Sequence, residues 1–274
     1  MRRDPHPPVG QVLVVDAGSS LTKLALASGE DMSRLGSFAT VGDGIAGWPA
    51  RLAAAVGRSA GAIGHVALSS VPPDLPALLG SRWAPPGRDP VPVRVVGPGS
   101  VDLPVAYRSP SGLGADRLAN AVAAVERWGA PVVVVDVGTA ITCDLVGPGP
   151  RFAGGAIAPG PRAAYAGLVG AAPHLAQPGG LAVDGELPLV PATTAEAVRV
   201  GILRGAAALV DGLARGYHGV AGPCPVVVTG GLGAVVAREC DTVTAVDPDL
   251  TLRGILLATR GGARPVGERL KGAA

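Results

Sequence analysis

Two short segments of the sequence place an aspartate, a glycine and a hydroxyl side chain at the same spacing, directly after an apolar run. The first occupies residues 16–20 and the second residues 136–140. In such a turn the glycine allows a positive φ, and backbone amides and hydroxyls donate hydrogen bonds to phosphate oxygens. An aspartate at the strand end can hold magnesium directly or through water, and Lys23 adds a positive charge on the next strand. The pattern indicates a polyphosphate site, although a single Asp-x-Gly segment is most often only a turn.

The two segments belong to an internal repeat. Residues 14–22 read Val-Val-Asp-x-Gly-Ser-x-x-Thr, and residues 134–142 read Val-Val-Asp-x-Gly-Thr-x-x-Thr. Such a repeat predicts two halves that each begin with a strand, a turn and a second strand. Later in the chain, a strand expected at residues 225–228 is followed by Thr-Gly-Gly and then a helix. Together these features resemble the phosphate–phosphate–adenosine pattern of sugar kinases, chaperone ATPases and actin, whereas no Walker loop is present.

Asp116 is the strongest candidate for a catalytic residue. It stands in Gly-Ala-Asp-Arg, where a Pro- and Gly-rich segment meets a helix expected at residues 115–128. Phosphoryl transfer to a hydroxyl needs a base that accepts the hydroxyl proton, and Arg117 is suited to grip an acidic acceptor through two hydrogen bonds. The alternative is that Asp116 only stabilises the start of this helix through the helix dipole.

Composition limits the class of protein. The 274 residues include 23 Lys and Arg against 21 Asp and Glu, and 48% are apolar, so the chain is expected to fold despite its 42 glycines and 27 prolines. A net charge of +2 and 3% aromatic residues argue against nucleic-acid binding. Three widely spaced cysteines support neither a disulfide framework nor a zinc site, and no apolar run is long enough to span a membrane. We therefore expect a soluble, cytoplasmic protein.

Apolar runs and breaker residues predict an α/β fold. Strands are expected at residues 12–15, 21–27, 65–71, 132–135 and 225–228, and helices at residues 51–56, 115–128, 194–215 and 234–239. A frayed arm is expected before residue 10, and no long helix between residues 72 and 110, because prolines are frequent there. Glu196 and Asp211 on the long helix are expected to face solvent. The expected domains are residues 1–115, an N-terminal phosphate-binding domain, and residues 116–274.

Residues 107–117 resemble a family signature. They read Tyr-x-x-Pro-x-x-Leu-Gly-x-Asp-Arg, which is similar to the signature of type III pantothenate kinases. The resemblance extends to Asp-x-Gly-Thr-Ala-x-Thr at residues 136–142, Gly-Gly-x-Ile-x-Pro-Gly at residues 154–160, the helix start at residues 194–201 and Thr-Gly-Gly at residues 229–231. It implies duplicated actin-like, ribonuclease H-like (ASKHA) domains with a cleft between them that holds ATP.

The resemblance also implies an activity and a role for each matching residue. The activity is ATP-dependent phosphorylation of pantothenate to 4′-phosphopantothenate, the first step of coenzyme A biosynthesis, with Asp116 as general base. The residues implied to bind pantothenate are Tyr107, Gly114, Ala115, Arg117 and Thr194. Those implied to bind ATP are Asp16, Gly18, Ser19, Ser20, Lys23, Thr139, Gly230 and Gly231. Asp16 would also hold Mg²⁺, and Asp136 the K⁺ or NH₄⁺ ion that the family requires. The family forms homodimers, with residues 154–160 near the partner subunit.

One departure from the family pattern concerns the first turn. The family usually has asparagine where this chain has Ser19, and a hydroxyl offers fewer hydrogen bonds than an amide. We expect weaker phosphate binding rather than a different reaction. Two other hypotheses remain: another small-molecule kinase or phosphatase of the same superfamily, and a non-catalytic regulatory homologue.

Overall fold

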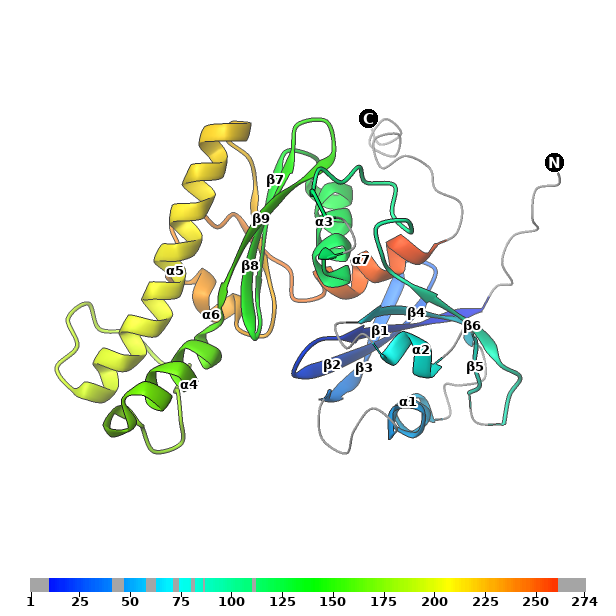
Figure 1. Cartoon of the computed structure of the whole chain (residues 1–274), viewed down its shortest axis with the longest axis horizontal. Coiled ribbons are helices and arrows are strands. Elements are labelled where there is room, and N and C mark those ends of the chain that lie inside the picture. Colours follow the sequence, from blue (N-terminus) through cyan, green and yellow to red (C-terminus); the bar gives the residue numbers. More distant parts are fainter. Residues whose placement is uncertain are drawn as a thin grey trace. The chain divides into compact units, whose positions relative to one another are not determined.

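The computed structural model describes residues 10–40, 47–57, 63–70, 74–79, 82–85, 87–109 and 112–260, so the arm expected before residue 10 lies outside the described residues. Contacts divide the chain into two units (Figure 1). Unit 1 comprises Met1–Asp102, Ser109–Ala123 and Thr251–Glu268, and unit 2 comprises Leu103–Arg108, Ala124–Leu250 and Arg269–Ala274. The division expected at residues 115 and 116 stays a prediction, and each unit is described by itself.

Unit 1 is built on a mixed sheet with the strand order β3-β2-β1-β4-β6-β5. Its strands are β1 (Gln11–Ala17), β2 (Leu21–Ser28), β3 (Asp31–Ala39), β4 (Ile63–Ser70), β5 (Arg82–Trp83) and β6 (Val91–Val95). β1, β2 and β3 pair antiparallel, whereas β4 lies parallel to β1 and β6 parallel to β4. The carboxyl ends of β1 and β4 therefore meet at one edge of the sheet.

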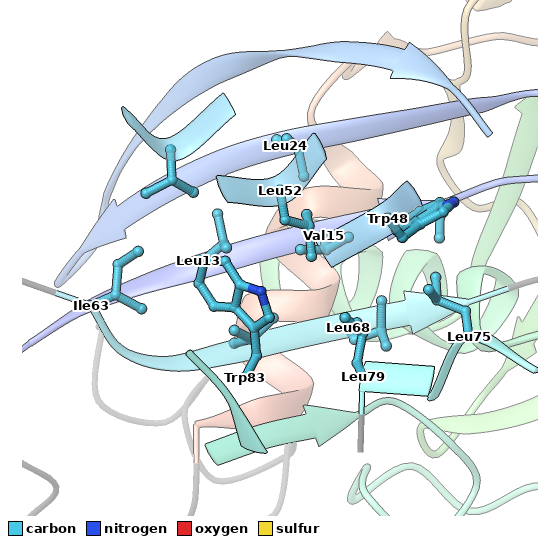
Figure 2. Close-up of a cluster of buried hydrophobic side chains, with 13 residues drawn as sticks. Leu13, Val15, Leu24, Trp48, Leu52, Ile63, Leu68, Leu75, Leu79 and Trp83 are labelled. Atoms are coloured by element: carbon cyan, nitrogen blue, oxygen red, sulfur yellow. The ribbon is translucent and has the colours of Figure 1, made fainter. Parts of the chain in front are cut away.

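One face of this sheet packs against α1 (Trp48–Val56) and α2 (Leu75–Leu79). Trp48, Leu52 and Val56 recur every four residues and form the buried stripe of α1. Figure 2 shows Trp48 and Leu52 of this stripe among Leu13, Val15 and other buried side chains of the same core. Since alternate residues of a strand face opposite sides, Asp16 projects from the other face of β1.

The opposite face packs against α7 (Leu250–Thr259) and the first half of α3 (Ala115–Trp128). Val14 lies in this cluster together with Ala119 of α3 and Ile255 of α7. A Cβ atom on Gly254 would collide with the backbone carbonyl of Ala119, so glycine allows the two helices to approach closely. The bounds predicted for α3 are confirmed.

Unit 2 repeats this topology, with the strand order β11-β10-β7-β8-β9. Its strands are β7 (Val132–Val137), β8 (Ala140–Gly147), β9 (Arg151–Pro159), β10 (Val226–Thr229) and β11 (Ala245–Val246). β7, β8 and β9 pair antiparallel, and β10 lies parallel to β7. In each unit, three antiparallel strands are thus extended by a parallel one, which confirms the duplicated α/β fold that the repeat predicted.

One face of the second sheet packs against α5 (Thr194–Ala221) and α6 (Gly233–Ala237). The chain reaches α5 through α4 (Pro161–Ala171) and the short helix η4 (Pro173–Leu175). Thr193 and Glu196 form a capping box at the start of α5, and the helix continues to Ala221, beyond its predicted end. None of the helices in the described ranges has the length and apolar character needed to cross a membrane.

The expectation that Asp211 faces solvent is wrong. This residue of α5 is 5% exposed, and its carboxylate accepts hydrogen bonds from the backbone N–H of Asp241, the backbone N–H of Thr242 and the Thr242 hydroxyl, at 2.9, 2.9 and 2.6 Å. Sequence periodicity did not indicate these partners because they lie in a loop that follows α6.

Candidate active site

The hairpin between β1 and β2 contains the first Asp-x-Gly segment. The turn is tight, because a Cβ atom on Gly18 would lie 3.0 Å from the carbonyl oxygen of Leu21. Ser19 and Ser20 are exposed at its tip. Asp16 is 7% exposed, and the Lys23 Nζ lies 3.8 Å from its Oδ2. The turn thus presents hydroxyl and amide donors beside a carboxylate that is already balanced by an ammonium group.

Strand register places three polar side chains in a row at the edge of this sheet. Asp16 pairs with Lys23 of β2 and with Ser69 of β4. Directly paired residues on neighbouring strands project from the same face. The row therefore lies on the face that packs against α3 and α7.

Asp116 lies at the start of α3, beside that same face. Ala115, the first residue of α3, packs against the cluster that contains Val14, and Val14 is two residues before Asp16 on β1. The Asp116 carboxylate is half-buried, and its Oδ1 accepts a hydrogen bond from the backbone N–H of Arg117 at 2.8 Å. It also lies over Gly114, where a Cβ atom would be only 2.5 Å from this oxygen.

Arg117, by contrast, is 4% exposed and already interacts with other groups of the protein. A buried guanidinium group is tolerated in proteins when it is paired, so part of its role is within unit 1. The structure thus brings most of the expected site residues into unit 1: Asp16, Gly18, Ser19, Ser20, Lys23, Gly114, Ala115, Asp116 and Arg117.

The remaining expected site residues belong to unit 2: Tyr107, Asp136, Thr139, Thr194, Gly230 and Gly231. Tyr107 contacts Phe152 edge-on, with 6.4 Å between the ring centroids, and its ring lies 3.8 Å from the position of a Cβ atom on Gly154. Thr194 is exposed in the first turn of α5. A cavity of about 410 Å³ opens beside that turn, lined by Gln177, Pro178, Gly180, Leu181, Ala182, Ala195, Glu196, Val198 and Arg199.

The second Asp-x-Gly segment forms the turn between β7 and β8. Asp136 is half-buried and Thr139 is exposed at the tip. Gly230 has a φ of +95°, and a Cβ atom there would collide with the Asp136 carboxylate. The Thr-Gly-Gly segment is therefore packed directly against the aspartate of the second turn.

The two hairpins differ in register, which the sequence repeat did not predict. Asp16 pairs with Lys23, whereas Asp136 pairs with Thr142, because the first turn has one residue more than the second. As a result Thr22, which aligns with Thr142 in sequence, points to the other face of its sheet and bonds to the Thr40 hydroxyl at 2.9 Å. The first carboxylate has a cationic neighbour across the hairpin, and the second has a hydroxyl.

The glycines of residues 154–160 have packing roles. A Cβ atom on Gly155 would collide with the Asp144 carboxylate, and one on Gly160 with the carbonyl oxygen of Gly138. The Gly160 amide also donates to the Thr139 carbonyl at 2.9 Å. The segment thus supports the second turn from β9.

The chemistry of the donors fits a nucleotide with magnesium. No group of three or more His, Cys, Asp or Glu side chains that could hold a metal occurs in the described part of the chain. Mg²⁺ in kinases is commonly held by one or two carboxylates together with substrate phosphates, and Asp16 beside an exposed hydroxyl-rich turn provides such a place. Asp136 and Thr142, which face each other across the second hairpin, offer a carboxylate and a hydroxyl as oxygen donors.

A duplicated sheet, each copy with a carboxylate at the end of its central strand and a glycine turn beside it, is typical of the actin-like, ribonuclease H-like fold class. The sequence model of the type III pantothenate kinase family matches residues 12–216. The chain belongs to this family.

Relatives cover nearly the whole chain. A type III pantothenate kinase of Thermomicrobium roseum is 34% identical over 93% of this chain and 99% of its own length. One of Syntrophotalea carbinolica is 35% identical over 89% of this chain and 96% of its own length. A crystal structure from Campylobacter jejuni, named for the Baf family of transcriptional activators, has a TM-score of 0.54 at 19% identity and covers 94% of this chain and 99% of that one. At that identity it shows the fold alone.

Proposed function

We propose that the chain transfers the γ-phosphoryl group of ATP to the hydroxyl of pantothenate, with Asp116 as general base. The chain is a kinase, and its product, 4′-phosphopantothenate, is the first intermediate of coenzyme A biosynthesis. The observation that carries the assignment of the base is the position of its carboxylate at the start of α3, beside the sheet face from which Asp16 and Lys23 project. Family membership supports the substrate.

In the proposed reaction the Asp116 carboxylate accepts the proton of the pantothenate hydroxyl while the oxygen attacks the γ-phosphorus and ADP leaves. Phosphoryl transfer of this kind depends on positioning and on neutralising charge on the phosphoryl oxygens. Lys23 supplies positive charge, and the turn with Gly18, Ser19 and Ser20 supplies donors. Mg²⁺, when bound with ATP, supplies the remaining charge, with Asp16 as its protein ligand.

The acceptor site is proposed to consist of Tyr107, Gly114, Ala115, Arg117 and Thr194. Gly114 and Ala115 precede the base directly, so a substrate hydroxyl next to Asp116 must pass close to their backbone. The Arg117 guanidinium is suited to the pantothenate carboxylate. The Arg117 side chain is 4% exposed and already interacts with other groups of the protein. We therefore expect these groups to rearrange when the guanidinium binds the pantothenate carboxylate.

Further proposals concern unit 2 and the assembly. Thr139, Gly230 and Gly231 are proposed to contact ATP, and Asp136 is proposed to bind a K⁺ or NH₄⁺ ion. The test of the ion is to measure the kinase rate in buffers whose only monovalent cation is potassium, ammonium or sodium. Equal rates in the three buffers would contradict the proposed ion site.

The chain is proposed to act as a homodimer, which the mass in solution tests. We also propose a cytoplasmic location, because all three cysteines are free thiols, as a reducing compartment leaves them. Recovery of the enzyme with a membrane or secreted fraction would contradict this.

The assay is incubation of the purified protein with pantothenate, ATP, Mg²⁺ and K⁺, followed by detection of 4′-phosphopantothenate. Asp116→Asn should lower kcat by about 10²- to 10⁴-fold, because the amide keeps the shape but does not accept the proton. Asp31→Asn is the control, because Asp31 is exposed at the first residue of β3, far along the sheet from the Asp16 edge.

Each outcome has a clear meaning. A kcat for Asp116→Asn within a few-fold of the wild type would assign the base elsewhere. Turnover of sugars or acetate but not of pantothenate would indicate another kinase of the superfamily. Absence of any turnover with intact ATP binding would indicate a regulatory protein.

A further inference from the structure

Ser69, the next-to-last residue of β4, is a buried hydroxyl without a hydrogen-bond partner. Its side chain is 1% exposed, and its Oγ has no partner among the described residues. Nearly all buried hydroxyls in proteins are hydrogen-bonded, because burial removes them from water. The unused hydroxyl of Ser69 therefore needs an explanation.

Its neighbours place this hydroxyl at the phosphate turn. Ser69 pairs directly with Asp16 across the parallel β1–β4 ladder, and neighbouring strands lie about 4.8 Å apart. Both side chains project from the same face, in a row that continues to Lys23. On the other side of β4 lies the apolar, buried Val96, whose backbone amide donates to the Leu68 carbonyl.

The second unit contains the same arrangement. Thr229, at the end of β10, pairs with Asp136 across the parallel β7–β10 ladder. Its side chain is fully buried, and its Oγ1 also has no hydrogen-bond partner among the described residues. Both copies of the duplicated sheet thus keep a hydroxyl beside the aspartate although neither hydroxyl bonds within the described fold. A structural role does not account for this repeated position.

We infer that Ser69 is a further nucleotide-binding residue, whose hydroxyl donates a hydrogen bond to a phosphate oxygen of the ATP held by Asp16 and Lys23. The inference rests on the proposed function. A hydroxyl can donate to a phosphate and stay neutral, so it adds a contact to the row without disturbing the ion pair between Asp16 and Lys23. Hydrogen bonds to charged groups are among the stronger ones in proteins.

The test compares Ser69→Ala with Ser28→Ala, a control at the exposed far end of β2. Ser69→Ala should raise the Kd for a non-hydrolysable MgATP analogue, measured by calorimetry, and the KM for ATP by about tenfold. The KM for pantothenate should stay unchanged. The melting temperature should be equal to that of the wild type or higher, since the substitution removes a buried hydroxyl without a partner. Ser69→Thr keeps the hydroxyl, so its Kd for the analogue should stay close to that of the wild type.

Other results would overturn the inference. An unchanged Kd in Ser69→Ala would show that the hydroxyl does not contact the nucleotide. A fall in melting temperature, with equal changes in both KM values, would show a structural role. The binding measurement does not depend on the acceptor, so a wild type that binds the analogue but does not phosphorylate pantothenate would contradict the proposed function alone. A wild type that binds no analogue would overturn both.

Discussion

Gly114 holds the proposed base in place through its lack of a side chain. Its carbonyl accepts the first backbone hydrogen bond of α3, from Leu118, and the Asp116 carboxylate fills the space where a Cβ atom would stand. A residue expected from the family resemblance to bind substrate therefore also determines where the carboxylate lies.

Gly114→Ala should lower kcat by about a hundredfold, because an added methyl group displaces the carboxylate and small displacements of catalytic groups have large effects on rate. The free energy of unfolding should fall by about 0.5 to 1 kcal/mol, since glycine is preferred over alanine at the residue that precedes a helix. Gly112→Ala is the control, because nothing lies within 4 Å of a Cβ atom there. Equal kcat values for Gly114→Ala and Gly112→Ala would show that Gly114 does not determine the position of the Asp116 carboxylate.

Single residues of the site differ in how far the sequence predicted them. Asp16, Asp136 and Asp116 were proposed from the sequence because carboxylates beside glycine have a recognisable spacing. Ser69, inferred here as a further site residue, was not proposed from the sequence, because a serine at the end of an apolar strand has no local signature. Its meaning depends on the strand pairing that places it beside Asp16.

At the scale of single elements, α5 is anchored to the loop after α6 through Asp211. Burial alone would raise the pKa of Asp211, but hydrogen bonds from the Asp241 amide and from Thr242, with the nearby Arg215 guanidinium, hold that pKa below its ordinary value. A carboxylate with a lowered folded-state pKa stabilises the fold above its unfolded-state pKa, and this stability is lost as the pH falls through the folded-state value.

Asp211→Asn should lower the free energy of unfolding by about 2 kcal/mol near neutral pH, because the amide group turns one acceptor into a donor facing backbone N–H groups. Asp241→Asn is the matched control. The Asp241 side chain is exposed and bonds to Arg215 at 2.9 Å, so its loss should cost less than about 1 kcal/mol. Urea unfolding of the wild type, Asp211→Asn and Asp241→Asn measures the free energy of unfolding of each. An equal loss of free energy in the two variants would contradict the anchoring role of Asp211.

The elements that the sequence predicted well are those with strong periodicity. α3 was predicted at its observed bounds because its apolar residues recur at helical spacing and Gly129 and Pro131 follow it. β3 and β9 were not predicted, because most of their residues are exposed or half-buried and β9 contains paired glycines. Their place in the sheet depends on pairing with β2 and β8 rather than on their own composition.

At the scale of the whole molecule, the duplication was predictable but its differences were not. The repeated Val-Val-Asp-x-Gly segment indicated two copies, and the order β3-β2-β1-β4-β6 in the first sheet matches β9-β8-β7-β10-β11 in the second, while the first sheet also contains β5. The extra residue in the first turn shifts the register of β2, which only hydrogen-bond pairing reveals. Likewise α7, from Thr251 onward, belongs to unit 1 although it comes late in the chain, because Gly254 lets it pack against α3.

Acid stability of the molecule should depend on His65 of β4. This side chain is 9% exposed and its Nε2 has no hydrogen-bond partner among the described residues. Burial, and secondarily the charge of Arg94, lower the pKa of His65 to about 4. At pH values between the unfolded-state pKa of about 6.5 and the folded-state pKa of about 4, His65 binds a proton in the unfolded chain but not in the folded one. The free energy of unfolding should therefore fall as the pH decreases through this window, by up to about 1.4 kcal/mol per pH unit.

His65→Gln should remove this part of the pH dependence, because glutamine does not titrate, whereas the exposed His174→Gln should retain it. Urea unfolding at several pH values between 4.5 and 7.5, roughly the window set by the two pKa values, measures the slope. Fluorescence of the buried Trp48 and Trp83 reports on unit 1, which contains His65. If the free energy of unfolding changes with pH at the same slope in the wild type and in His65→Gln, His65 becomes protonated in the folded protein, for example through water that reaches the imidazole. The acid sensitivity of unit 1 would then come from its carboxylates.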